Sequence, residues 1–263
     1  MARDGDGIYE SDAGFDALRD IKDDVMREVM YWFAPEQVEQ DVYWLEQALT
    51  VIEMLLILAE DKRGYRFVEN GTTIRRWQTM VFSVWDAEWN YRLPDYRDPI
   101  PYSEFAYRVE QRMLVNSLFD HLYNLTEETY GEQTLILTKR RPMFRGGDCV
   151  WNLCKRLIHR IVFELSDDND NRNDFFSIHD LHEVWVAVDL LGLLCERYQM
   201  SVHLRTETVQ HWLDLNIVLW LNEYGREPGE QVSTETLSED PLYVNVMNAF
   251  VRLIMAIQKV NGD

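Results

Sequence analysis

The residues with the clearest chemical potential in this sequence are the adjacent pair His179 and Asp180. An imidazole and a carboxylate that converge with further ligands can bind a metal ion, and the metal can activate water for hydrolysis. The pair also falls in the first turn of a predicted helix, where the helix dipole alone favours an acidic residue. The sequence therefore favours a structural role and leaves a metal-dependent hydrolase as the alternative. In such a hydrolase, the remaining ligands of the metal ion would be His121 or His159 upstream of the pair and Asp189 or Asp214 downstream.

The His–Asp pair resembles the dyad of all-α phosphohydrolases of the HD type, although the residues that follow it depart from that family's small-residue continuation. His179, His182 and Glu183 share one side of the helix, but three ligands from one helix leave a metal's coordination shell open. His182, Asp189 and Glu196 lie on one line along the same helix, so we expect a solvated face there. We therefore predict no catalytic residue, no metal and no cofactor.

Four glutamates spaced by seven residues form a stripe on a helix that we expect to begin at Pro35. A spacing of seven keeps side chains nearly on one line of a helix. One interpretation is a solvated face. The other is an acidic surface that attracts a basic partner or imitates the phosphates of a nucleic acid. The candidate partner-binding residues of this stripe are Glu39, Glu46, Glu53 and Glu60.

The segment 139–160 has a net positive charge, opposite in sign to that of the whole chain. It holds seven basic residues and a single acidic one, Asp148. Gly146 and Gly147 precede a predicted helix start, where unpaired N–H groups can hold an anion. One interpretation is a docking or anion site, with Arg140, Arg141 and Arg145 as its candidate residues. The other is neutralisation of the protein's own acidic helices.

The composition narrows the class of partner. The 263 residues carry a formal net charge of −20, which repels nucleic acid and anionic membrane surfaces and favours a basic protein partner. Three cysteines among apolar residues indicate buried free thiols of a reducing compartment. The start of the chain lacks the apolar stretch of a signal peptide, and the most apolar run, residues 54–59, is shorter than the ~20 residues of a membrane span. We therefore expect a cytoplasmic protein.

Helical periodicity dominates the chain and predicts an all-α fold: one bundle of about eight helices with an aromatic-rich core, since the chain has nine Trp, thirteen Tyr and eleven Phe. We expect a single domain over residues 1–263, with a possible subdivision near 166–174. A short β-like piece at 134–138 is also expected. The last helix has one thin polar stripe, which predicts that protein surrounds it. The predicted helices cover residues 13–33, 35–60, 72–91, 103–130, 148–165, 178–200, 206–224 and 241–260.

The opening residues carry a motif: Gly5, Gly7, Tyr9, Glu10, Asp12 and Asp16. The segment 5–18 resembles the start of a small bacterial family of unknown function, which opens with Gly-x-Gly, an aromatic residue, Glu-Asn-Asp and an acidic amphipathic helix. Ser11, Gly14 and Ala17 replace the family's Asn, Ala and Trp. That family has no settled activity, but small acidic proteins of this kind often resemble immunity or defence-related proteins. The other interpretation of the segment is a glycine-containing turn before an N-capped helix.

Together these patterns predict a non-catalytic interaction protein that binds a basic macromolecular partner, in its most concrete form an immunity or anti-defence inhibitor. The alternative is an all-α phosphohydrolase that uses the His179–Asp180 region. Metal content and the activity of a His179→Ala variant distinguish the two.

Overall fold

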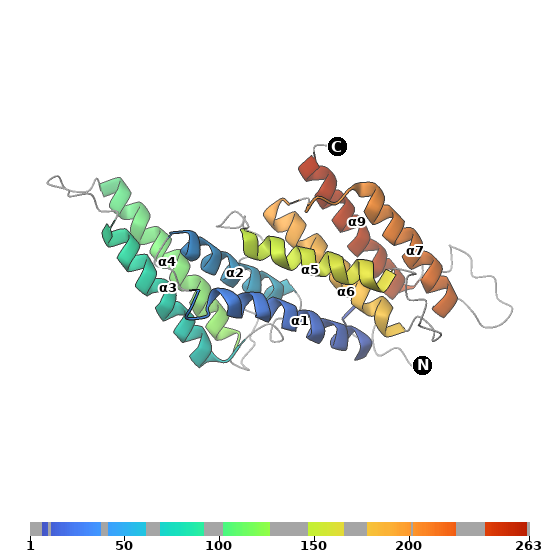
Figure 1. Cartoon of the computed structure of the whole chain (residues 1–263), viewed down its shortest axis with the longest axis horizontal. Helices are drawn as coiled ribbons and strands as arrows, with labels where there is room; N and C mark the ends of the chain where they lie inside the picture. The colour runs from blue at the N-terminus through green and yellow to red at the C-terminus, as the bar shows by residue number, and fades with distance from the viewer. Residues whose placement is uncertain are drawn as a thin grey trace. The chain divides into compact units, whose positions relative to one another are not determined.

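A computed structural model describes residues 7–9, 12–37, 42–61, 69–91, 102–126, 147–165, 178–200, 202–224 and 240–261. These residues form eight helices and no strand, which confirms the all-α prediction (Figure 1). The expected β-like piece at 134–138 lies outside them. None of the helices so described combines the length and the apolarity needed to cross a membrane. The helices are α1 (Asp12–Trp32), α2 (Val42–Asp61), α3 (Gly71–Tyr91), α4 (Tyr102–Asn124), α5 (Asp148–Leu165), α6 (Ile178–Tyr198), α7 (Thr206–Tyr224) and α9 (Pro241–Asn261).

The second helix begins at Val42 and not at Pro35 as the sequence suggested. Residues 33–37 form turns instead, and the amide of Gln37 donates to the carbonyl of Ala34 at 2.9 Å. Proline suits the second position of such a turn as well as the first position of a helix, because both need the φ that its ring imposes. Pro35 therefore predicted the start of a helix, although it lies in a turn.

The chain divides into two compact units, one made of residues 1–24 and 151–263 and the other of residues 25–150. The division falls inside α1 and α5 and not in the segment 166–174. Whether the chain behaves as one domain stays a prediction. The units are called unit 1 and unit 2 below, and each is described by itself.

Unit 1 is built around α6, which packs against α7 and α9 (Figure 1). Every residue of α6 from Leu181 to Cys195 is buried. The rings of Trp185 and Trp220 pack at a tilt of 37°, with their centroids 4.9 Å apart. Gly192 lets α9 approach closely, because a Cβ there would lie 3.3 Å from the backbone nitrogen of Leu253. The enclosed helix of this unit is therefore α6.

The prediction that protein surrounds the last helix was wrong. One face of α9 is buried, but Val244, Val251 and Met255 on the opposite face are 39%, 44% and 63% exposed. Apolar residues all round a helix normally indicate burial. Here α6 and α7 cover one side of α9, and apolar side chains also occupy the open side. The buried residues of α9 are Leu242, Val246, Ala249, Phe250, Leu253, Ala256 and Ile257.

In unit 2, α2 packs against α3 and α4, and every residue of α2 from Gln47 to Ala59 is buried. Aromatic rings fill the space where α1 ends: Phe33 stacks on Trp77 with centroids 5.1 Å apart and meets Trp44 edge-on at 6.2 Å. Such ring pairs stabilise a core beyond their buried area. The aromatic-rich core is confirmed.

Candidate interaction surface

The predicted acidic stripe is not a continuous exposed surface. Glu46 is exposed, but Glu53 is only 1% exposed. The seven-residue spacing does align the two glutamates along α2. However, Glu46 lies near the exposed start of the helix, and Glu53 lies where protein surrounds it. The spacing alone could not show this change in burial. Glu39 lies outside the described residues, and so does the side chain of Glu60. Of the four candidates, Glu46 remains as an exposed carboxylate.

The basic segment is described only in its second half, because Arg140, Arg141 and Arg145 lie outside the described residues. Arg160 donates to Asp24 at 3.0 Å and also to Glu183, within unit 1. Burial alone would lower the pKa of Arg160, but the hydrogen bonds to Asp24 and Glu183 outweigh it and raise that pKa above its ordinary value. Arg160 therefore neutralises the protein's own acids, as the second interpretation expected.

The start of α5 is occupied by a side chain from α2. Gln47 accepts a hydrogen bond from the amide of Cys149 at 3.3 Å, and a Cβ on Gly147 would overlap the Gln47 amide. A Cβ at position 147 would therefore require the Gln47 side chain to shift, and the anion site suggested for this helix start has that side chain in its place. Burial, with a smaller contribution from Glu28, raises the pKa of Cys149 to about 12, so its thiol is inert near neutral pH. Cys149, Cys154 and Cys195 are all buried free thiols, as predicted.

The solvated face expected on α6 is wrong for two of its three residues. His182 and Asp189 are buried, whereas Glu196 is exposed. Asp189 accepts hydrogen bonds from the hydroxyl of Tyr9 at 2.6 Å and from Arg252 at 3.0 Å. These partners lie 180 and 63 residues away in the chain, so the pattern of α6 alone could not show them.

The described residues provide no metal site for the alternative hypothesis of a metal-dependent hydrolase. Among the described residues, no three or more His, Cys, Asp or Glu side chains are grouped so that they could hold a metal ion. The side chains of His179 and Asp180 lie outside the described residues, so a role for them stays a prediction. Two of the proposed further ligands have other contacts: Asp189 binds Arg252, and the ring of His159 stacks on Phe163 at 6.4 Å.

Two residues of the N-terminal segment 5–18 have a structural role in unit 1: Tyr9, which belongs to the motif, and Gly14, which departs from it. Tyr9 bonds to Asp189, as described above. Gly14 lies so close to the backbone carbonyl of Ile8 that a Cβ would overlap it. The structure therefore requires glycine at position 14, where the pattern expected from the resemblance has alanine. The resemblance itself stays a prediction.

The feature of unit 2 that does resemble a binding surface is built from two aromatic doublets, Tyr31–Trp32 at the end of α1 and Tyr43–Trp44 at the start of α2. Consecutive helical residues point about 100° apart, so the two members of a doublet cannot face the same way. Trp32 and Trp44 turn inward and are 8% and 1% exposed. Tyr31 and Tyr43 turn outward, and each is 49% exposed.

The inward tryptophans brace the outward tyrosines. The indole of Trp44 donates to the carbonyl of Trp32 at 2.9 Å, and the indole of Trp32 donates to the buried carboxylate of Glu28 at 3.1 Å. Tyr31 and Tyr43 both meet the Trp32 ring edge-on, with centroids 5.3 Å and 6.1 Å from it. The two tyrosines therefore rest on a fixed platform.

The rim of this platform is acidic. The hydroxyl of Tyr43 donates to the carboxylate of Asp148 at 2.5 Å, and that hydrogen bond is the main reason that the pKa of Tyr43 rises to about 12. Glu46 lies one helical turn from Tyr43 and is exposed, as is Met30 beside Tyr31. Met30, Tyr31, Tyr43, Glu46 and Asp148 are called the tyrosine patch below.

Four members of the tyrosine patch were not predicted as binding residues from the sequence: Met30, Tyr31, Tyr43 and Asp148. The signal that could have found the two tyrosines is the Tyr–Trp doublet, repeated at two neighbouring helix ends. Because adjacent side chains point about 100° apart, a helix end that is covered on one side favours turning one aromatic side chain of such a doublet away from the core. Glu46 was predicted, although for a longer stripe.

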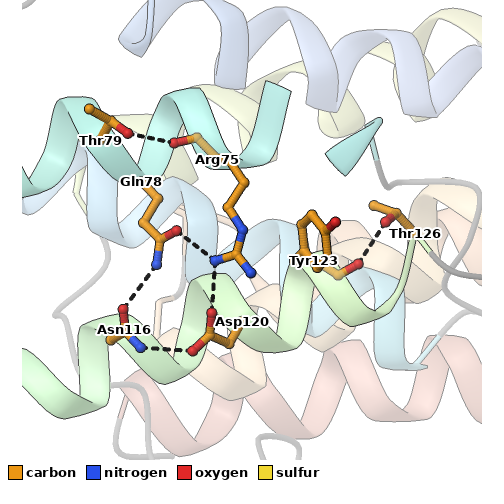
Figure 2. Close-up of polar contacts among 7 residues, drawn as sticks. All are labelled: Arg75, Gln78, Thr79, Asn116, Asp120, Tyr123 and Thr126. Atoms are coloured by element: carbon orange, nitrogen blue, oxygen red, sulfur yellow. Dashed lines mark hydrogen bonds and ion pairs between the residues drawn. The ribbon is translucent and has the colours of Figure 1, made fainter. Parts of the chain in front are cut away.

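A second surface of unit 2, between α3 and α4, is a groove of about 770 Å³. Arg75 donates to Asp120 at 2.9 Å and to Gln78 at 2.7 Å, and lies over the ring of Tyr123 (Figure 2). Asn116 joins the same ladder by accepting from Gln78 and donating to Asp120. Farther along the groove, Arg112 pairs with Asp86. The charged side chains named here are thus engaged by the facing helix, which fits a role in holding α3 against α4.

Compared with known proteins, the chain matches no family model, no curated protein and no solved structure.

Proposed function

We propose that this chain is a non-catalytic interaction protein that binds a basic protein partner, and that the tyrosine patch is its docking surface. The single observation that carries the proposal is the pair of half-exposed tyrosines held on a braced platform and rimmed by carboxylates. Tyrosine is among the residue types that dominate binding energy at protein interfaces. Rings that are already ordered lose little side-chain entropy when a partner covers them.

The charge of the chain supports a basic partner. A formal net charge of −20 accelerates encounter with a positively charged surface, and Glu46 and Asp148 give an incoming Arg or Lys a carboxylate next to an aromatic ring. Direct binding of nucleic acid is not favoured by the same charge. The finer form of the proposal is a cytoplasmic immunity or anti-defence inhibitor whose target is a basic toxin or nuclease.

The test is a comparison of captured partners between matched variants. A tagged copy is expressed in its native host and purified at low salt, alongside a Tyr31→Ala/Tyr43→Ala variant and a Met113→Ala control. Met113 is exposed on α4 of the same unit and outside the tyrosine patch. We expect a stoichiometric basic protein with the wild type and the control, and its loss from the double variant.

Equal capture by all three proteins, or a stoichiometric partner that is itself acidic, contradicts the proposal. Circular dichroism of the double variant establishes that it is folded, so that a loss of capture reports on the surface.

A further inference from the structure

The outward face of α9 is an exposed apolar surface in unit 1. Val244, Val251 and Met255 recur at a spacing of seven and four residues, which places them on one line of the helix. Asn248 lies on the same line and is exposed. The three apolar side chains of this line are called the α9 face below. Exposed apolar side chains aligned on one helix face are candidates for an interaction site when a partner can cover them together.

The charges of α9 are unlike those of the rest of the chain. The chain has 46 acidic residues, yet α9 contains none in its 21 residues, and its charged side chains are Arg252 and Lys259. Arg252 is turned toward Asp189 of α6. A basic partner therefore finds no carboxylate among the side chains of α9. A second copy of this acidic chain, in contrast, can approach α9 without placing its own carboxylates against another carboxylate.

The spacing of residues along α9 also fits a second copy. When two α9 helices lie antiparallel with the two-fold axis midway between Asn248 and Val251, Val244 of one copy faces Met255 of the other. In the same register Lys259 of one copy faces Asp240 of the other, at the residue before α9 begins. Asp240 caps its own helix by accepting from the amide of Leu242 at 3.0 Å. One two-fold axis thus places Asn248 against Val251 at the middle, pairs Val244 with Met255 on either side, and sets opposite charges at both ends.

We infer that two copies of this chain associate through an antiparallel, two-fold symmetric contact of the α9 face. The inference is independent of the proposed function, because it concerns other residues and another partner. A stable interface buries about 800 Å² per partner, which is more than one helix face offers, so the dimer is weak, with a Kd on the order of micromolar. Two-fold symmetric dimers are the commonest oligomers of identical chains.

The first test is the oligomeric state of the full chain, measured by sedimentation velocity over a range of concentrations. Wild type is expected to shift from monomer to dimer, and Val251→Glu to raise the dissociation constant at least about tenfold, because it places two carboxylates at the centre of the contact. The matched control is Val218→Glu on α7, which is 55% exposed and lies in the same unit. A wild type that stays monomeric at all concentrations, or a control that dissociates the dimer as strongly, overturns the inference.

The second test is the register. Single-cysteine additions Val244→Cys and Met255→Cys are made in chains whose native Cys149, Cys154 and Cys195 are buried. A short thiol cross-linker is expected to join the two variants when they are mixed and to join neither to itself. Efficient self-linking of Val244→Cys contradicts the antiparallel arrangement. Lys259→Glu should weaken the dimer several-fold, whereas Lys155→Glu on the exposed side of α5 should not.

Discussion

The tyrosine patch of unit 2 and the α9 face of unit 1 are both exposed apolar surfaces, but they differ in the charges around them. The tyrosine patch has two carboxylates at its rim, Glu46 and Asp148. The helix that carries the α9 face has no acidic residue. On a chain of net charge −20 we expect this difference to select the partner of each surface: the rim of the first attracts basic groups, and the second presents no carboxylate of α9 to a like-charged copy.

The two surfaces should therefore respond to salt in opposite directions. Salt screens exposed charges beyond a Debye length of about 10 Å at 0.1 M. Screening weakens the attraction between this chain and a basic partner. It also weakens the repulsion between two copies of the acidic chain, so self-association is expected to tighten.

Replacing both exposed tyrosines should break the first interaction and leave the second intact. Tyr31→Ala/Tyr43→Ala is expected to raise the Kd for the basic partner roughly 100-fold, the size that two interface hot spots can reach. Isothermal titration calorimetry with the purified partner measures the change, and Met113→Ala is the matched control. Sedimentation velocity should show unchanged self-association. A variant that loses both interactions contradicts the separation of the two surfaces.

Raising salt should act on the partner complex mainly through the rate of association. Between about 0.05 M and about 0.5 M salt, we expect that rate to fall roughly tenfold or more, because long-range steering by the acidic chain is screened. The dissociation rate should change much less. Surface plasmon resonance separates the two rates. An association rate that does not depend on salt would show that the charge of the chain plays no part in recognition.

Removing a single rim charge should have a smaller effect. Glu46→Gln keeps the shape of the side chain and is expected to raise the Kd for the basic partner about threefold, as exposed ion pairs contribute at most about 1 kcal/mol. Glu110→Gln, an exposed acid on α4 of the same unit, is the control for net charge. Calorimetry distinguishes the two. If both variants lose the same affinity, only the total charge matters and Glu46 has no local role.

The hydrogen bond between Tyr43 and Asp148 should be visible in a pH titration. Asp148→Asn is expected to return the pKa of Tyr43 from about 12 toward its ordinary value of 10.0, because the accepting carboxylate is gone. In the wild type the raised pKa means that this bond stabilises the folded state fully below about pH 10, and that the stabilisation is lost as the pH rises through about 12. Differential tyrosinate absorbance between the two proteins measures the shift. Identical titration curves would show that the bond does not form.

The local pattern of apolar residues in the sequence was sufficient to predict most of the helices. It did not show which of these helices are buried in the core. The predicted fifth and seventh helices have the same bounds as α5 and α7, because periodicity and end signals agree there. For α6, however, His182 and Asp189 resembled a solvated face. Asp189 is instead buried with Tyr9 and Arg252, which come from distant parts of the chain. Such pairing depends on tertiary contacts that helical periodicity does not contain.

The candidate surface was predictable only in part, for a related reason. The seven-residue spacing of Glu46 and Glu53 gives their alignment but not the point along α2 where protein closes around the helix. Tyr31 and Tyr43 are aromatic, so residue type alone suggests that they belong to the core. Their outward direction follows from the burial of the adjacent Trp32 and Trp44. Which member of an aromatic doublet faces the core is set by packing.

The measurement that tests this account most directly is sedimentation velocity of the wild-type chain at low and at high salt. If the charges around an apolar surface select what it binds, the dimer should be scarce at about 0.05 M salt and more abundant at about 0.5 M. Val251→Glu should remain monomeric in both, because its added carboxylates lie within the contact. A wild-type dimer that dissociates as salt rises would contradict the account, since it would show that attraction between charged side chains outweighs the repulsion between the two acidic chains.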